Sequence, residues 1–77
     1  MMNIDNDNIC LRVIEAVRSS RRPYAVFVGR SIEFMPVDGK RFASLSSSPE
    51  RMAHLVGIFD VNNTPADVVA AVSEMSA

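Results

Sequence analysis

Two turn signals within residues 24–45 constrain this chain more than any other feature of its sequence. Gly29-Arg30 and Asp38-Gly39 are typical of two-residue hairpin loops, in which glycine readily supplies a positive φ. They separate three runs with strand character, at residues 24–28, 31–37 and 40–45. We therefore predict a three-stranded antiparallel meander, in which Pro36 favours an edge or the end of its strand.

The loop lengths also set a register for the predicted sheet. A two-residue loop at 29–30 pairs Phe27 with Ile32, and a second at 38–39 pairs Phe34 with Ala43. Because opposed residues share a face, one face of the sheet becomes wholly apolar. Its members are Ala25, Phe27, Ile32, Phe34, Ala43 and Leu45. Agreement between two independent turns favours the meander.

The opposite face of the predicted sheet is half apolar, which is unusual for a solvated face. In this register Met35 lies opposite both Tyr24 and Phe42, and Val26 lies on the same face. An exposed apolar patch on a small protein usually marks an interface. The alternative is that a terminal helix packs over these residues and completes a third layer.

Helical periodicity flanks the predicted strands at the N-terminal side. Residues 8–19 place apolar side chains at i, i+3, i+4 and i+7, namely Cys10, Val13, Ile14 and Val17. The acidic and amide residues at 5–8 are candidate N-caps, and Arg18 suits the negative helix end. Pro23 prevents the helix from continuing.

Two further helices are predicted after the strands. Ser47 or Ser48 caps the first, and Pro49 at the first helical position favours Ser48. Its apolar face is Met52, Leu55, Val56 and Phe59. After a turn at 60–63, Thr64 caps the last helix, with Val68, Val69, Val72 and Met75 on its apolar face. The predicted fold is one α+β domain over residues 1–77, in the order α-β-β-β-α-α.

Composition excludes several function classes. The chain has 77 residues, a net charge of −1, and 48% hydrophobic residues, which is typical of an ordinary globular domain. Cys10 and His54 are the sole cysteine and histidine, so we expect no disulfide within the chain, no metal site and no cofactor. No motif links either residue to a catalytic partner, and the three glycines form no phosphate-binding loop. We therefore expect a protein that is not an enzyme.

The start of the chain is polar and acidic, without a targeting pattern. The longest apolar run, residues 24–28, is far too short to cross a membrane. Together with the single cysteine, these features predict a cytoplasmic protein that does not bind a membrane.

Charge is unevenly distributed along the chain. Residues 18–41 carry six basic and two acidic side chains, a net +4, and the remainder carries −5. In the predicted meander, one end of the sheet gathers Arg21, Arg22, Lys40 and Arg41. Arg30 lies at the opposite end. Such a basic rim can meet phosphates or an acidic protein surface, or simply remain solvated.

These features predict a small protein–protein interaction module, such as a regulator, inhibitor or adaptor, that forms a homodimer or binds another protein. Its expected binding residues are Tyr24, Val26, Met35, Phe42, Arg21, Arg22, Lys40 and Arg41. The alternative is a nucleic-acid-binding regulator that uses the basic segment Arg18–Arg41. Neither hypothesis involves a small-molecule substrate.

Overall fold

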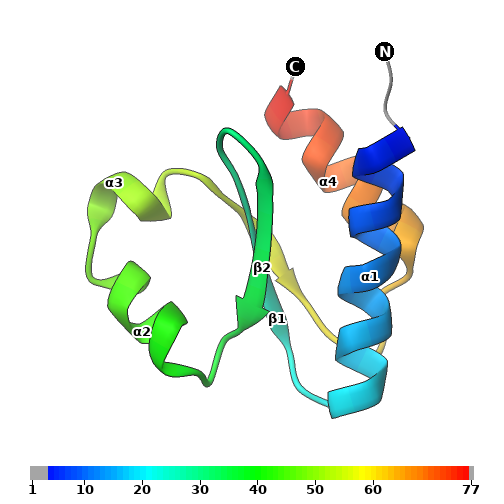
Figure 1. Ribbon diagram of the computed structural model, residues 1–77, viewed down its shortest axis with the longest axis horizontal. Helices are drawn as coiled ribbons and strands as arrows, with labels where there is room; N and C mark the ends of the chain where they lie inside the picture. The colour runs from blue at the N-terminus through cyan, green and yellow to red at the C-terminus, as the bar shows by residue number, and fades with distance from the viewer. Residues whose placement is uncertain (1–3, 77) are drawn as a thin grey trace.

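The computed structural model describes residues 4–76, which form four helices and three strands (Figure 1). The elements are α1 (Ile4–Ser20), β1 (Tyr24–Val28), β2 (Ile32–Pro36), α2 (Lys40–Ser46), α3 (Pro49–Met52), β3 (Leu55–Phe59) and α4 (Pro65–Ser76). The α+β class and the three-stranded antiparallel sheet are thus confirmed. Residues 1–3, at the polar start of the chain, lie outside the described part.

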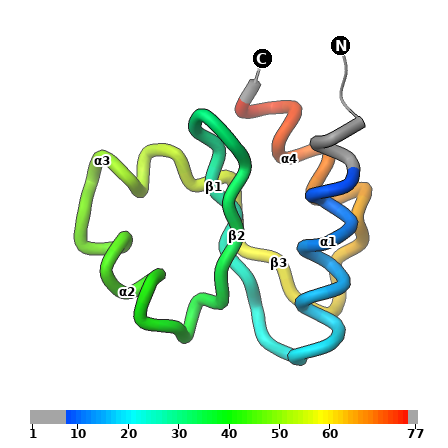
Figure 2. The backbone as a smooth tube through the Cα atoms, viewed as in Figure 1, coloured from blue at the N-terminus to red at the C-terminus, as the bar shows by residue number. Residues whose placement is uncertain are grey.

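The sheet has the strand order β2-β1-β3, so β1 is central and both neighbours are antiparallel to it. Helices α1 and α4 pack beside one another on one side of the sheet, and the α2–α3 segment arches over the other side (Figures 1 and 2). The sheet is therefore the middle layer of three. This arrangement leaves its edges and its ends as the surfaces open to partners.

The position of the third strand corrects the sequence prediction. Residues 40–46 form α2, and the strand is supplied by residues 55–59, which we had assigned to a helix. In α2 the side chains of Phe42 and Leu45, three residues apart, both pack toward the sheet. Runs of five to seven residues satisfy a helical and a strand pattern equally well. The predicted order α-β-β-β-α-α is therefore replaced by α-β-β-α-α-β-α.

The β1–β2 hairpin also differs from prediction by one residue. Its loop has three residues, Gly29 to Ser31, and the Gly29 N–H donates to the Ser31 carbonyl at 3.1 Å. Val28 consequently lies opposite Ile32. A shift of one residue moves every side chain of β2 to the other face. The single apolar face predicted from the loops is wrong, because the apolar residues of β1 and β2 are divided between both faces.

One face of the sheet forms the first hydrophobic cluster, against α1 and α4. Its buried members are Cys10, Val13, Ile14, Val17, Val26, Phe59, Val68 and Val72. The helical face predicted for residues 10–17 is confirmed, although α1 begins at Ile4, so residues 5–8 lie within the helix. Met75 is 44% exposed and does not join this cluster. α1 ends at Ser20, and the next residue, Arg21, has φ 59°.

The other face forms a second, smaller cluster. Ala25, Phe27 and Met35 are buried there beneath half-buried apolar side chains from the α2–α3 segment, including Phe42, whose ring centroid lies 6.2 Å from that of Phe27. No residue of α2 or α3 is itself buried. The α2–α3 layer therefore covers this face with its side chains but remains largely exposed itself.

The cap of α3 settles the choice between two serines. Ser48 is the N-cap, and its Oγ accepts a hydrogen bond from the Arg51 N–H at 3.4 Å. Pro49 occupies the first helical position. The preference for Ser48 over Ser47 is confirmed. The sequence could predict this cap because it depends on neighbouring residues and needs no tertiary contact.

The start of α4 leads to a prediction on pH dependence. The Asp67 carboxylate accepts the backbone N–H of Thr64 at 2.9 Å and the side-chain amide of Asn63 at 3.2 Å. These hydrogen bonds favour the ionised form and lower the pKa of Asp67 below its ordinary value. The resulting stabilisation is present above the ordinary pKa and is lost as the pH falls through the lowered one.

We therefore expect Asp67→Ala to lower the Tm at neutral pH, and the difference from the unmodified chain to shrink between about pH 5 and about pH 2. Thermal melts followed by circular dichroism measure both values. Glu74→Ala, which removes an exposed acid from the other end of α4, is the control and should leave the Tm at neutral pH nearly unchanged. A constant difference for Asp67→Ala at every pH would contradict this role of the carboxylate.

Candidate functional site

The apolar patch predicted for partner binding is not one surface. Tyr24 and Val26 belong to the cluster beneath α1 and α4, whereas Met35 and Phe42 belong to the cluster beneath the α2–α3 segment. Val26 is 0% exposed and Met35 is 2% exposed. The physical reason is the one-residue change in register, which places Tyr24 opposite Pro36 and Ala25 opposite Met35. The expectation that these four residues form an exposed patch is therefore wrong.

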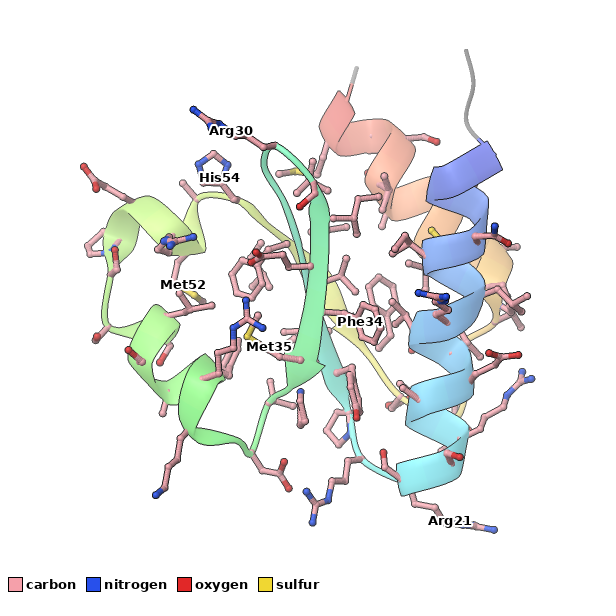
Figure 3. The ribbon with its side chains drawn as sticks, viewed as in Figure 1. Arg21, Arg30, Phe34, Met35, Met52 and His54 are labelled. Carbon is pink, nitrogen blue, oxygen red and sulfur yellow. The ribbon has the colours of Figure 1, made fainter. Side chains whose placement is uncertain are left out.

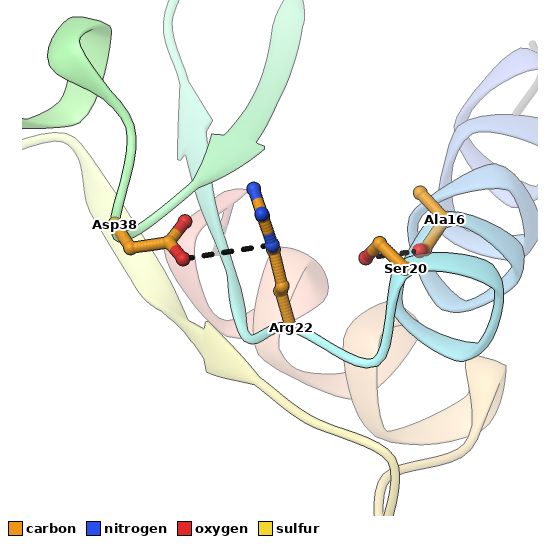
Figure 4. Close-up of polar contacts among 4 residues, drawn as sticks. All are labelled: Ala16, Ser20, Arg22 and Asp38. Atoms are coloured by element: carbon orange, nitrogen blue, oxygen red, sulfur yellow. Dashed lines mark hydrogen bonds and ion pairs between the residues drawn. The ribbon is translucent and has the colours of Figure 1, made fainter.

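The four predicted basic residues are all exposed, and two of them form ion pairs with carboxylates. Arg22 pairs with Asp38, with 3.6 Å between Nε and Oδ2, and Arg41 pairs with Glu33, with 3.4 Å between Nη2 and Oε1 (Figure 4 shows the first pair). Arg21 lies at the end of α1 and Lys40 begins α2. Exposed pairs of this kind contribute at most about 1 kcal/mol to stability. They do reduce the charge that this rim can offer to phosphates.

A groove of about 440 Å³ lies at the opposite end of the molecule, between the β1–β2 hairpin and the end of α3. Phe27 and Leu45 contribute apolar lining, and the basic lining comes from Arg30, Arg51 and His54. Figure 3 shows Arg30 and His54 projecting at the same end, far from Arg21. The placement of Arg30 away from the basic rim is thus confirmed.

Backbone hydrogen bonds position the walls of this groove. The Val28 N–H donates to the His54 carbonyl at 3.0 Å, which fixes the chain after α3 beside the hairpin. The His54 N–H donates to the Arg51 carbonyl at 3.0 Å. The two walls of the groove come from separate segments of the chain, residues 27–33 and 45–54, so the sequence offered no signal that joined them.

The outer edge of β3 is a second exposed feature. The Val28 N–H donates to the His54 carbonyl, beside β3, and the Val37 N–H, beside β2, donates to the Pro23 carbonyl at 3.1 Å. The backbone groups of successive β1 residues therefore point alternately toward β3 and toward β2. Gly57 and Phe59 lie opposite Val26 and Tyr24 and therefore face β1. Ile58 turns its N–H and C=O outward.

The side chain of Ile58 is also open to solvent. It lies opposite Ala25, on the face that the α2–α3 segment covers, but it is 51% exposed because that cover does not extend to this edge. The strand contains no charged residue and no proline. β2, at the other edge, carries Glu33 and Pro36, which are features that discourage edge pairing. We had placed Ile58 within a helix, so sequence reasoning missed this edge.

The two residues considered for catalysis are separated by the sheet. Cys10 is 1% exposed in the cluster beneath α1 and α4, and His54 lines the groove on the other side. Among the side chains that the structure describes, no group of three or more acidic, histidine or cysteine residues is placed to hold a metal ion. No helix in the described part of the chain is long and apolar enough to cross a membrane.

Comparison with known proteins adds no relative: the chain matches no protein-family model, and searches of curated proteins and of solved structures give no significant match.

Proposed function

We propose that this chain is a non-enzymatic protein-interaction module that self-associates through the outer edge of β3. The observation that supports this proposal is the outward-facing backbone of Ile58 beside an apolar side chain that is 51% exposed. An uncharged edge strand is a template for pairing with another strand. The separation of Cys10 and His54 by the sheet supports a function without catalysis.

A second copy of the chain is the partner that this edge fits best. In antiparallel pairing about a two-fold axis, Ile58 of each copy exchanges both backbone hydrogen bonds with Ile58 of the other. The two side chains then lie on the same face and exclude water from each other. The pairing would join two three-stranded sheets into a continuous sheet of six strands. A turn closed by the Asp60 N–H donating to Asn63 Oδ1 at 2.9 Å limits the pairing to a short segment.

The test is the solution mass of the chain and of Ile58→Lys, measured by light scattering over a range of concentrations. We expect a concentration-dependent dimer for the unmodified chain, and a monomer for Ile58→Lys at concentrations where the former is dimeric. The introduced charge would face the same charge on the second copy, and this repulsion opposes pairing. Leu11→Lys is the matched control, because Leu11 is 46% exposed on α1 and lies away from the edge.

A monomeric unmodified chain at high concentration would overturn the proposal. A dimer that survives Ile58→Lys but is lost in Leu11→Lys would instead assign the contact to the helical side. Circular dichroism of both variants shows whether each remains folded, and a folded state is expected because both positions are exposed.

The nucleic-acid alternative has weaker support. Arg22 and Arg41, two of its four basic residues, already pair with carboxylates. Phosphate binding would weaken steeply with added salt, whereas edge pairing would change little. We also propose a reducing compartment such as the cytoplasm, since the single cysteine is buried and cannot form a disulfide within the chain.

A further inference from the structure

The groove between the hairpin and α3 combines an apolar lining with basic side chains. Leu45, which is half-buried, and the part of Phe27 that stays exposed, 6% of the residue, provide apolar surface. The side chains of Arg30, Arg51 and His54 provide hydrogen-bond donors. Its volume of about 440 Å³ is in the range of small-molecule sites. Neither arginine makes an ion pair with another described residue.

The acidic residues of the groove do not cancel the positive charge of its arginines. Glu33 is engaged by Arg41, with 3.4 Å between Oε1 and Nη2, so its charge is largely compensated within the protein. Glu50 is the second carboxylate of the lining. The two arginines of the lining therefore face one carboxylate that has no ion pair among the described residues. The local potential favours a negative ligand.

We propose that this groove binds a small organic anion that consists of an apolar ring and a carboxylate or phosphate group. The ring would lie against Phe27 and Leu45, where its burial removes apolar surface from water. The anionic group would accept hydrogen bonds from Arg30 and Arg51, because a planar guanidinium group can donate two parallel hydrogen bonds to the two oxygens of a carboxylate. His54 adds a donor at the same end. The molecule is bound as a ligand, and the proposal includes no reaction.

If this proposal is right, tight binding requires both the apolar ring and the anionic group of the ligand. An apolar ring without charge would leave both arginines without a partner, and inorganic phosphate would leave the apolar lining solvated. We therefore choose 2-naphthoate as the probe, with the neutral 2-naphthalenemethanol and inorganic phosphate as its two halves. Titration into ¹⁵N-labelled protein, followed by backbone amide shifts, reports both the affinity and the place of binding.

We expect 2-naphthoate to bind at least about tenfold more tightly than either comparison compound. The shifted amides should include Gly29, Arg30, Ser31 and His54, which line the groove. The double variant Arg30→Gln/Arg51→Gln should lower the affinity at least about tenfold, because it removes the charged hydrogen bonds while it keeps two long polar side chains.

Arg18→Gln/Lys40→Gln is the matched control, since it removes the same total charge at exposed positions outside the groove. It should bind 2-naphthoate nearly as the unmodified chain does. All four substituted residues are exposed, so both variants should keep a dispersed spectrum. Ile58→Lys should also bind normally, which separates this proposal from the one on self-association.

Three results would overturn the proposal. The first is the absence of amide shifts at the groove up to the solubility limit of 2-naphthoate. The second is equal affinity for the neutral alcohol, which would show a groove that selects apolar character alone. The third is an equal loss of affinity in both double variants, which would show a general response to net charge.

Discussion

Val26→Asp is expected to leave the chain unfolded at 25 °C. Val26 lies in the central strand, is 0% exposed and packs beneath α1 and α4. An unpaired carboxylate at this position costs several kcal/mol even after its pKa adjusts. The total stability of a chain of 77 residues is only about 4–12 kcal/mol. Far-UV circular dichroism and the dispersion of the amide spectrum measure the result.

Ile58→Asp provides the control on the same sheet. Its side chain is 51% exposed, so the new carboxylate remains hydrated and the variant should stay folded as a monomer. The contrast tests the observed register against the one expected from two-residue loops. If Val26→Asp gave a folded protein with a well-dispersed spectrum, Val26 would have to lie on an exposed face.

The second large effect is expected for Phe59→Ala. The Phe59 ring is 6% exposed and lies over Gly57, where a Cβ atom would come within 3.3 Å of the ring. Removing the ring leaves a cavity between the sheet and the helices and exposes the backbone of Gly57. Replacements of this kind cost about 3–5 kcal/mol. Urea titration of the unmodified chain and the variant gives the difference in unfolding free energy.

Phe42→Ala is the matched comparison, because it removes the same ring from the other face of the sheet. Phe42 is half-buried in α2, which has no buried residue, so we expect a smaller loss of about 1–2 kcal/mol. Equal losses for the two variants would show that the α2–α3 segment is packed as tightly as α1 and α4. That outcome would also argue against a groove that is permanently present beside the α2–α3 segment.

The burial of both sheet faces bears on the two proposals made above. The two hydrophobic clusters occupy the faces, and the proposed sites lie elsewhere, at the outer edge of β3 and in the groove at the hairpin end. These two sites use different chemistry. The edge offers backbone hydrogen bonds beside Ile58, and the groove offers basic side chains above an apolar lining. Occupation of one therefore need not depend on the other.

Sequence reasoning located Arg30, one of the basic residues of the groove, at the correct end of the molecule. It placed Arg30 away from the rim of Arg21 and Arg22, because hairpin topology alone determines which end a loop occupies. It did not bring Arg51 and His54 to that end, since it continued the helix after Ser48 through residue 59. In this segment a short helix that ends at Met52 and is followed by β3 has the same apolar pattern as one long helix, so the sequence did not distinguish them.

Several features of the fold follow from local signals in the amino-acid sequence. These are the apolar face of α1, the hairpin within residues 24–36, the Ser48 cap and the start of α4 after Thr64. Each rests on contacts within a few residues, so neighbouring side chains are sufficient to specify it. Packing between distant segments selected residues 55–59 rather than 40–45 as the third strand, and the hairpin register differs by one residue from the one expected. Both choices depend on which arrangement buries apolar residues on the two faces of β1, and that burial involves residues distant in the chain.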